Sequence, residues 1–366
     1  MKRMNSIAMV MASLGGGGAE RVAVALSDYF IHRGYEFTFL LTKKNECVYE
    51  LPEGVKVNPI CDLEGTSPFS QIKGIRHEMK KDDSRIFLSF LCDQNIFLLA
   101  AAVGLRNKVA VSVRNLPTTD FDSKNELLYK ALLHVRDFLY ATKSSAVVFQ
   151  TKDQMSYFPS GVRRKGVLIP NPLSSGLPER NRACPRRVVT ASGRLTKQKN
   201  YPMLIRVFSI VHKRIPDVTF EIYGDGELRK DLEQLVNSEG LTDSVVFCGF
   251  CVDAVQRIAS SSVYVMASNW EGLSNSLIEA LAMGVPSVCT RCLGGGAEAV
   301  IEDGVNGYLV DRDDHEVMAQ RVVELLLDPD LRDSMSAEAA KLADELSLET
   351  IGKKWEETLF PEGSIQ

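Results

Sequence analysis

The sequence predicts an α/β protein built from two doubly wound, Rossmann-like domains that face a cleft. Short apolar runs alternate with amphipathic stretches in both halves of the chain, and the alternation breaks once, near residue 170. Alternation of this kind implies a parallel sheet covered by helices on both faces. At 366 residues the chain suits two domains of roughly 150–200 residues each. In such folds the ligand binds at the carboxyl ends of the strands.

The first half begins with an apolar run, a glycine loop and a helix. The helix is expected over residues 20–33, with Val22, Leu26 and Phe30 on one face and Gly34 as its stop. Apolar runs predict the strands of this half at 5–11, 36–41, 55–60, 85–90, 108–113, 146–150 and 167–169.

The second half repeats the alternation after a stretch rich in proline and serine. The segment from Pro170 to Pro178 cannot form regular structure, so we expect domains at 1–172 and 187–345 joined by a linker at 173–186. A final helix within 346–366 is expected to pack back on the N-terminal domain. The strands of the second half are predicted at 188–191, 218–223, 244–248, 262–266, 285–289 and 308–310.

Composition excludes several classes of function. The formal net charge of −4 argues against a nucleic-acid binder. No apolar run reaches the ~18 residues of a membrane span, and the start lacks a secretory signal, so a cytoplasmic protein is expected. The cysteine pairs Cys248/Cys251 and Cys289/Cys292 are spaced too far apart for a zinc ribbon and are interpreted as reduced packing residues. No metal site is predicted.

The first loop is rich in glycine. Gly15, Gly16, Gly17 and Gly18 lie between a strand and a helix, where bare backbone approaches a ligand and helix amides attract an anion. The dinucleotide pattern is not met, because Glu20 stands at its third glycine position and no acidic residue ends the second strand.

Two cations follow the first strand of the second half. Arg194 and Lys199 lie in the loop that opens the next helix, where a guanidinium fork and an ammonium can hold a diphosphate. An ordinary solvated basic loop explains the same residues equally well.

Two glutamates flank a helix start in the segment 270–286. Ser274 or Asn275 is the expected N-cap, so Glu271 lies just before the helix and Glu279 about one turn inside it. The amides between them suit phosphate, and the two carboxylates suit sugar and ribose hydroxyls. The alternative is a pair of surface glutamates around a common N-cap.

These motifs, in this order, resemble the retaining glycosyltransferases of family 4, which have the GT-B fold. The resemblance rests on 193–200, on Gly224-Asp225-Gly226-Glu227, on Glu271 and Glu279 separated by seven residues, on 294–298 and on 303–310. The opening residues 16–22 are similar to those of members that extend polyprenyl-diphosphate-linked oligosaccharides and surface polysaccharides.

The resemblance implies a role for each matching residue. Arg194 and Lys199 hold the donor diphosphate, Glu271 contacts the donor sugar near the reacting carbon, and Glu279 binds the ribose. Gly16 and Gly17 approach the phosphates from the N-terminal domain. The remaining expected donor contacts are the backbone at Val246, Phe247 and Cys248, which meets a uracil base, and the amides of Gly272, Leu273, Ser274, Asn275 and Ser276.

The acceptor side is expected in the N-terminal domain. Lys73, Arg76 and Lys80 recur at helical spacing and form a basic stripe suited to a lipid diphosphate or an anionic membrane, or else a solvated helix face. Many relatives carry a histidine after the strand at 108–113, and Arg114 or Asn115 stands there in this chain. The apolar face of a helix at 124–143 is interpreted as core.

The function expected is transfer of a hexose or N-acetylhexosamine, with retention, from a UDP-sugar to a lipid-linked glycan. The enzyme is expected to need no metal or other cofactor and to lie peripherally on the inner face of the cell membrane. Two alternatives stay open: a nucleotide-sugar epimerase of the same fold, and a non-catalytic sugar-nucleotide-binding partner subunit.

Overall fold

The computed structural model of the protein describes residues 5–43, 47–60, 67–119, 126–180, 187–251 and 253–361. The chain divides into two compact units, one formed by Met1–Pro172 together with Leu348–Gln366 and the other by Leu173–Ser347. Residues 173–180 of the expected linker belong to the second unit, and 181–186 lie outside the described residues. The predicted α/β class is confirmed, because every predicted strand forms, with ends within two residues of those expected.

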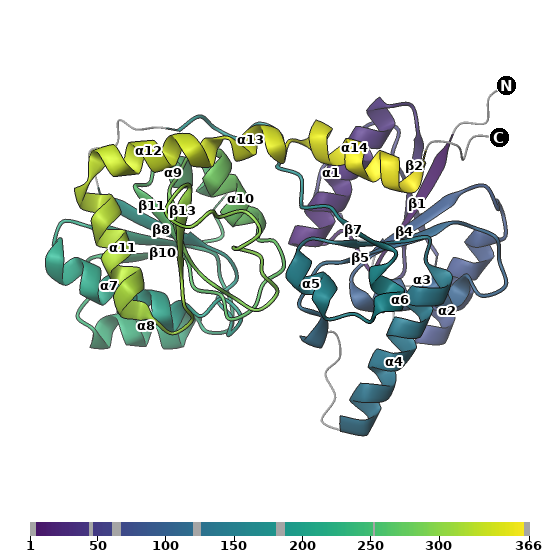
Figure 1. The fold of residues 1–366 in the computed structure, drawn as a ribbon, viewed down its shortest axis with the longest axis horizontal. Helices are drawn as coiled ribbons and strands as arrows, with labels where there is room; N and C mark the ends of the chain where they lie inside the picture. Colours follow the sequence, from purple (N-terminus) through teal and green to yellow (C-terminus); the bar gives the residue numbers. More distant parts are fainter. Residues whose placement is uncertain are drawn as a thin grey trace. The chain divides into compact units, whose positions relative to one another are not determined.

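The first unit is built on a seven-stranded parallel sheet in the order β3-β2-β1-β4-β5-β6-β7. Helices cover both faces, with α1 and α14 on one side and α2, α3 and α4 on the other (Figure 1). Its strands are β1 (Ser6–Met11), β2 (Glu36–Leu41), β3 (Lys56–Pro59), β4 (Ile86–Phe90), β5 (Val109–Val113), β6 (Ala146–Phe149) and β7 (Gly166–Leu168). Its helices are α1 (Gly18–His32), α2 (Pro68–Met79), α3 (Cys92–Ala101), the 3₁₀ turn η1 (Pro117–Thr119), α4 (Glu126–Lys143), α5 (Lys152–Ser156), α6 (Ser160–Arg163) and α14 (Leu348–Leu359).

The second unit repeats this plan with six parallel strands in the order β10-β9-β8-β11-β12-β13. Figure 1 shows α7 and α8 on one side of the sheet and α10 and α12 on the other. The strands are β8 (Val188–Ser192), β9 (Thr219–Tyr223), β10 (Val245–Gly249), β11 (Val263–Met266), β12 (Ser287–Thr290) and β13 (Gly307–Val310). The helices are α7 (Tyr201–Arg214), α8 (Arg229–Ser238), α9 (Ala254–Ala259), α10 (Asn275–Ala282), α11 (His315–Leu327), α12 (Pro329–Ala340) and α13 (Leu342–Glu345).

Each sheet has one point at which the strand order reverses. In the first unit β1 pairs with β2 on one side and with β4 on the other, and in the second unit β8 pairs with β9 and β11. The chain therefore leaves β1 and β4, or β8 and β11, toward opposite faces, which opens a crevice for ligands at their carboxyl ends. The motifs predicted to bind phosphate follow β1, β8 and β11.

The last helix, α14, completes the first unit. Trp355 is fully buried, with its ring centroid 5.7 Å from that of Phe90. Gly352 lies against Tyr29 of α1 so closely that an added Cβ would be 2.4 Å from the ring. Glu356 accepts hydrogen bonds from the hydroxyls of Tyr29 (2.8 Å) and Tyr35 (2.7 Å).

We expect the α14 contact to give the first unit an acid-sensitive stability. Burial alone raises the pKa of Glu356, but the two tyrosine hydroxyls and the charge of Arg33 outweigh it and hold the pKa below 4.5. A carboxyl whose pKa is lowered in the folded state stabilises that state above its unfolded pKa, and this contribution disappears as the pH falls through the folded pKa. Glu356→Gln should therefore lose about 1 kcal/mol at neutral pH, roughly 2–4 °C in Tm.

Thermal unfolding of both proteins from pH 7 to pH 3 tests this expectation. The Tm difference should be full at pH 7 and shrink below about pH 4.5. Glu357→Gln, on the exposed neighbouring residue, is the control and should match the wild type throughout. A Tm gap for Glu356→Gln that stays constant down to pH 3 would contradict the assignment.

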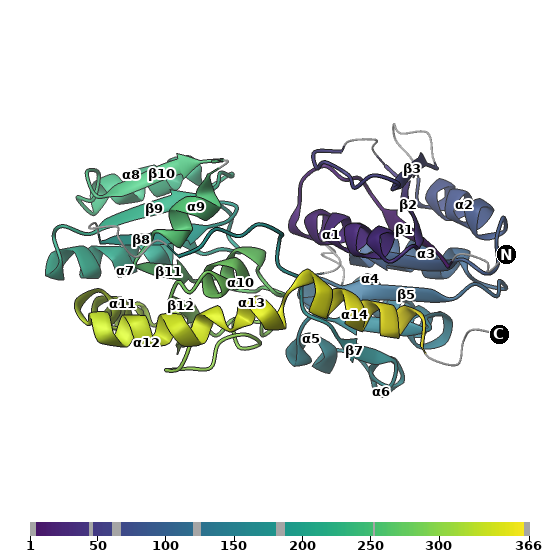
Figure 2. The same ribbon diagram turned by 90° about the horizontal axis from the view of Figure 1, so that it is seen from above.

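One prediction about packing is wrong. The apolar residues of α4 were expected to belong to the core, yet Leu127, Leu128, Ala131 and Val135 are exposed. The buried side of α4 instead carries Arg136 and Tyr140, as well as half-buried leucines. Figure 2 shows α4 within the first unit, beside α3, which it contacts. None of the helices in the described residues is both long enough and apolar enough to cross a membrane.

Candidate functional site

Two loops of the second unit meet at the switch point of its sheet. One loop follows β8 and the other follows β11, so both leave the carboxyl ends of adjacent strands. They are tied together by hydrogen bonds from the Asn269 amide N–H to the Gln198 carbonyl (2.8 Å) and from Gln198 Nε2 to the Trp270 carbonyl (3.1 Å). The structure therefore brings the predicted basic loop and the predicted glutamate loop into one site.

Lys199 and Glu271 form an ion pair at this meeting point. Lys199 Nζ lies 2.5 Å from Glu271 Oε2, and the two side chains are only 15% and 13% exposed. The lysine stem passes over Gly193, where an added Cβ would lie 3.1 Å from Lys199 Cε. Arg194, on the same loop, is exposed. An ammonium and a carboxylate are thus fixed side by side with limited access to water.

The N-terminus of α10 lies next to this ion pair. The hydroxyl of Ser276 donates to the carbonyl of Ser192 (3.2 Å) and accepts from Tyr264 (2.9 Å), which joins the start of α10 to the end of β8. The N-cap residue Ser274 contacts the Ser276 hydroxyl (3.1 Å) and makes no side-chain hydrogen bond to a helix amide. A helix start held in this way presents positive dipole and N–H groups to an anion.

A third loop, after β12, supports the glutamate loop from behind. The Glu271 amide donates to the carbonyl of Leu293 at 2.9 Å. Gly294 has φ of +97°, and a Cβ there would lie 2.2 Å from the carbonyl oxygen of Glu271. A Cβ at Gly296 would lie 1.6 Å from the carbonyl oxygen of Gly272. Only glycine permits this contact of backbone on backbone, and the contact fixes the position of Glu271.

A similar contact explains the Gly-Asp-Gly motif. A Cβ at Gly224 would lie 2.1 Å from the carbonyl oxygen of Gly193, and one at Gly226 would lie 2.6 Å from that of Leu195. The loop after β9 therefore supports the loop that carries Lys199. These glycines act as positioning residues.

Glu279 lies one turn inside α10 and is only 5% exposed. Its Oε1 accepts a hydrogen bond from the hydroxyl of Ser174 at 2.9 Å. The carboxylate is therefore enclosed by the segment that enters the second unit, and its predicted contact with a ribose stays a prediction.

The expected base-binding backbone lies at the edge of the same sheet. Residues Val246, Phe247 and Cys248 belong to β10, whose pairing with β9 shifts register between Phe247 and Gly249. The Arg229 guanidinium lies 4.7 Å from the centroid of the Phe247 ring. This irregular edge strand leaves Val246 45% exposed.

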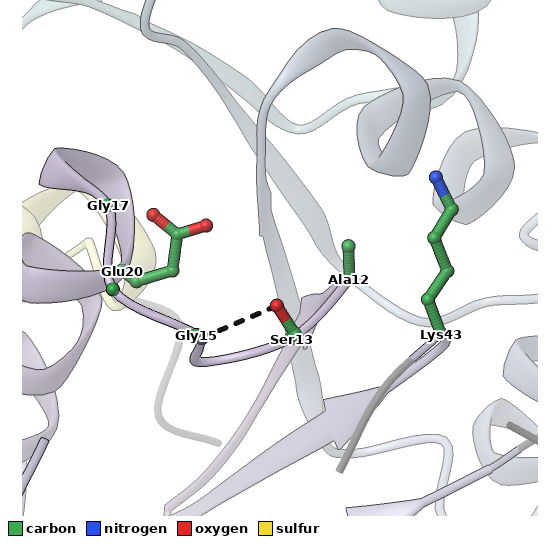
Figure 3. A pocket seen from close by; sticks show the side chains of 7 residues that line it. Ala12, Ser13, Gly15, Gly17, Glu20 and Lys43 are labelled. Atoms are coloured by element: carbon green, nitrogen blue, oxygen red, sulfur yellow. Dashed lines mark hydrogen bonds between the residues drawn. The ribbon is translucent and has the colours of Figure 1, made fainter. Parts of the chain in front are cut away.

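The glycine loop of the first unit lines a cavity of about 400 Å³ (Figure 3). Gly16 has φ of +101°, and Gly17 is the N-cap of α1. The Tyr49 hydroxyl donates to the Gly17 carbonyl at 2.9 Å, which holds the loop in place. The cavity is lined by Ala12, Ser13, Gly15, Gly16, Gly17, Glu20 and Lys43.

Glu20 and Lys43 were not predicted as site residues. Figure 3 shows their side chains on opposite sides of the cavity. Lys43 follows β2 and pairs with Asp93 at 3.4 Å. The sequence contained an indication that Lys43 belongs to the site. This lysine follows the second strand, where dinucleotide-binding proteins carry an acidic residue. An ammonium at this place favours a phosphate over a ribose.

The basic stripe of α2 forms only in part. Lys73 and Lys80 are exposed, as expected. The Arg76 Nη1 instead donates to the carbonyls of Ala101 (2.5 Å) and Val103 (2.7 Å). Arg76 therefore satisfies carbonyls at the C-terminal end of α3, and the prediction that it contacts an acceptor is corrected.

Arg114 is buried and packs the core of the first unit. Its guanidinium lies 3.8 Å from the Phe90 ring centroid and 5.7 Å from that of Trp355, and Nη1 donates to Asn171 Oδ1. Burial lowers the pKa of Arg114 to about 9. The structure offers an acceptor no access to this group, so its expected role is corrected to a structural one.

The cysteine pairs behave differently from each other. Cys289 and Cys292 are buried, and burial raises the pKa of Cys292 to about 12, so its thiol stays neutral. Cys248 and Cys251 are partly exposed. Within the described part of the chain, no group of three or more His, Cys, Asp or Glu side chains is placed to hold a metal ion.

Comparison with known proteins identifies the class. Residues 186–328 match the family described as Glycosyl transferases group 1, so the second unit carries a domain of that family. With HepE of Anabaena, solved in complex with UDP and glucose, the chain shares 19% identity at a TM-score of 0.81, covering 98% of this chain and 100% of that one. The fold is therefore GT-B, and the matched domain confirms the predicted resemblance to glycosyltransferases.

Two relatives match over almost their whole length. An α-1,4-N-acetyl-D-galactosaminyltransferase of Campylobacter jejuni, named for an oligosaccharide acceptor on PP-undecaprenol, is 26% identical and covers 96% of this chain and 97% of its own. The amylovoran biosynthesis glycosyltransferase AmsD of Erwinia amylovora is also 26% identical, covering 94% of this chain and 96% of its own.

Proposed function

We propose that this glycosyltransferase moves a hexose or N-acetylhexosamine from a UDP-sugar to a glycan carried on a polyprenyl diphosphate, with retention at the anomeric carbon. The observation that carries the proposal is the Lys199–Glu271 ion pair at the N-terminus of α10, inside the domain matched to Glycosyl transferases group 1.

The charges of this site match the charges that the reaction develops. As the glycosidic bond to the diphosphate breaks, the sugar becomes positive and the departing phosphate negative. Lys199 and the first amides of α10 face the negative charge, and Glu271 faces the positive one. Charged groups that are already held in place need little reorganisation in the transition state. Exposed Arg194 adds a second cation for the diphosphate.

The donor and the stereochemistry are proposed from chemistry and from relatives. HepE was solved with UDP and glucose, and the Campylobacter relative is named for an α-1,4 product. An α-linked product from an α-linked sugar nucleotide requires retention. We infer that the leaving phosphate accepts the acceptor proton on the face from which it departs, and that the fixed cations serve where other enzymes use a metal.

The acceptor and its location are proposed from the relatives' names. An undecaprenyl diphosphate carrier confines the acceptor to a bilayer, so this protein would work peripherally at the inner face of the cell membrane. The exposed ammonium groups of Lys73 and Lys80 on α2 are the proposed contacts for acceptor phosphates.

Incubation of the protein with a panel of UDP-sugars and a polyprenyl-diphosphate-linked glycan tests the proposal. Mass spectrometry should detect one added hexose or N-acetylhexosamine, with an α anomeric signal by NMR and with turnover preserved in EDTA. Isomerisation of the donor without acceptor would indicate an epimerase, and UDP binding without transfer to any acceptor would indicate a non-catalytic subunit. Either result would overturn the proposal, and loss of turnover in EDTA that manganese restores would overturn its metal independence.

A further inference from the structure

Helix α4 of the first unit exposes large apolar side chains along one face. The exposed fractions are 80% for Leu127, 53% for Leu128, 53% for Val135 and 63% for Phe138. At 100° per residue these four side chains, together with Ala131, fall within about a quarter to a third of the helix circumference. Single exposed leucines are ordinary on a protein surface, but a contiguous apolar stripe marks an interaction surface.

The apolar stripe lies on a helix that protrudes from the first unit. Figure 1 shows that α4 extends beyond the layer formed by α2 and α3, with its N-terminal turns farthest from the sheet. The opposite side of α4 holds it in place through buried Arg136, whose Nη1 donates to the Pro117 carbonyl at 3.0 Å, and buried Tyr140. The stripe is therefore carried on a helix that is anchored from behind.

Basic side chains border the apolar stripe. Lys130 and His134 lie on one side of it along α4, and exposed Lys143 lies at its C-terminal end. Helix α6 packs against this end, where a Cβ added at Gly161 would lie 3.5 Å from Ala141 Cβ. Exposed Arg163 and Arg164 close that helix. Glu126, at the opposite end, is paired with Lys130 at 2.7 Å.

We propose that the α4 face, defined as Leu127, Leu128, Ala131, Val135 and Phe138, inserts into the interface of an anionic lipid bilayer, with Lys143, Arg163 and Arg164 on the lipid headgroups. An apolar stripe beside a basic border is the pattern of helices that lie in a membrane surface. A protein partner that covered this apolar face would not require the basic residues beside it. The inference deepens the proposed function, since it names the surface that brings the enzyme to its lipid-linked acceptor.

Vesicle flotation of the full-length protein tests this surface. The wild type should bind phosphatidylcholine vesicles containing 30% phosphatidylglycerol, and Leu127→Ser/Phe138→Ser should lower the partition coefficient at least tenfold. The matched control is Phe250→Ser/Leu327→Ser, which changes an exposed Phe (95%) and an exposed Leu (57%) of the second unit and should bind as the wild type does. Arg163→Gln/Arg164→Gln should weaken binding to these vesicles but not to pure phosphatidylcholine.

Two further measurements distinguish a failure of the membrane inference from a failure of the proposed function. Activity toward a detergent-solubilised acceptor should be unchanged in Leu127→Ser/Phe138→Ser, because α4 carries no proposed catalytic residue. Equal flotation of this variant and the wild type would overturn the inference, and so would a wild-type dimer that the variant converts to monomers. Vesicle binding by a wild type that transfers no sugar would instead overturn the proposed function and leave the membrane surface standing.

Discussion

Replacing Lys199 with methionine should lower kcat by about 10²–10³, the usual cost of removing one preorganised group from a charge-stabilising site. Methionine has nearly the length of the lysine stem and keeps its contact with Gly193, so the change removes charge rather than volume. It leaves the Glu271 carboxylate, which is 13% exposed, without its cation. The donor diphosphate would then depart without its nearest positive charge, and steady-state kinetics with saturating acceptor measure this loss.

Lys197→Met is the matched control for this experiment. Lys197 belongs to the same loop, is exposed, and holds its place through a main-chain carbonyl that accepts from Asn269 Nδ2 at 2.8 Å. Its replacement should leave kcat within about twofold of the wild type, because surface charges distant from the reacting atoms contribute little. If Lys199→Met turns over as fast as Lys197→Met, the ion pair has no part in catalysis.

Gly296→Ala should lower kcat/KM by at least about 10², although residue 296 is not expected to touch the substrate. The new Cβ would overlap the Gly272 carbonyl oxygen at 1.6 Å, so the loop carrying Glu271 must shift. A misplacement of about 1 Å costs roughly 10²-fold in rate. Overpacking should also reduce the free energy of unfolding by about 1–3 kcal/mol.

The two effects are separated by measuring kinetics well below the Tm of the variant. Gly161→Ala provides the control, because its Cβ would meet Ala141 at an ordinary contact distance of 3.5 Å, outside the second unit. A folded Gly296→Ala with wild-type kcat/KM would show that the β12 loop does not position Glu271.

Much of this architecture is visible in the sequence because strands buried on both faces appear as continuous apolar runs. The runs at β4 (IFLSF) and β5 (VAVSV) are examples, and both strands are buried along their whole length. The loops after β8 and β11 were recognisable for a related reason: their glycines, cations and glutamates follow such runs directly. Their meeting through Lys199 and Glu271 is a consequence of β8 and β11 being neighbours.

The predictions fail where the environment of a residue depends on a distant part of the chain. Periodicity identifies which residues of α4 share a face, but it does not say whether another element covers that face. Arg76 resembles a ligand contact until the C-terminal carbonyls of α3 are placed beside it. Arg114 resembles a surface cation until Trp355 of the final helix encloses it. Tertiary packing decided each of these cases.

The position of α14 has a consequence for how the protein is made. Trp355 and Gly352 fill the space beside Phe90 and Tyr29, yet they leave the ribosome only after the whole second unit. Residues 1–172 therefore emerge with one side of their core uncovered and stay incomplete while the whole second unit is translated. A nascent chain of this enzyme presents an apolar surface to chaperones until its final helix is synthesised.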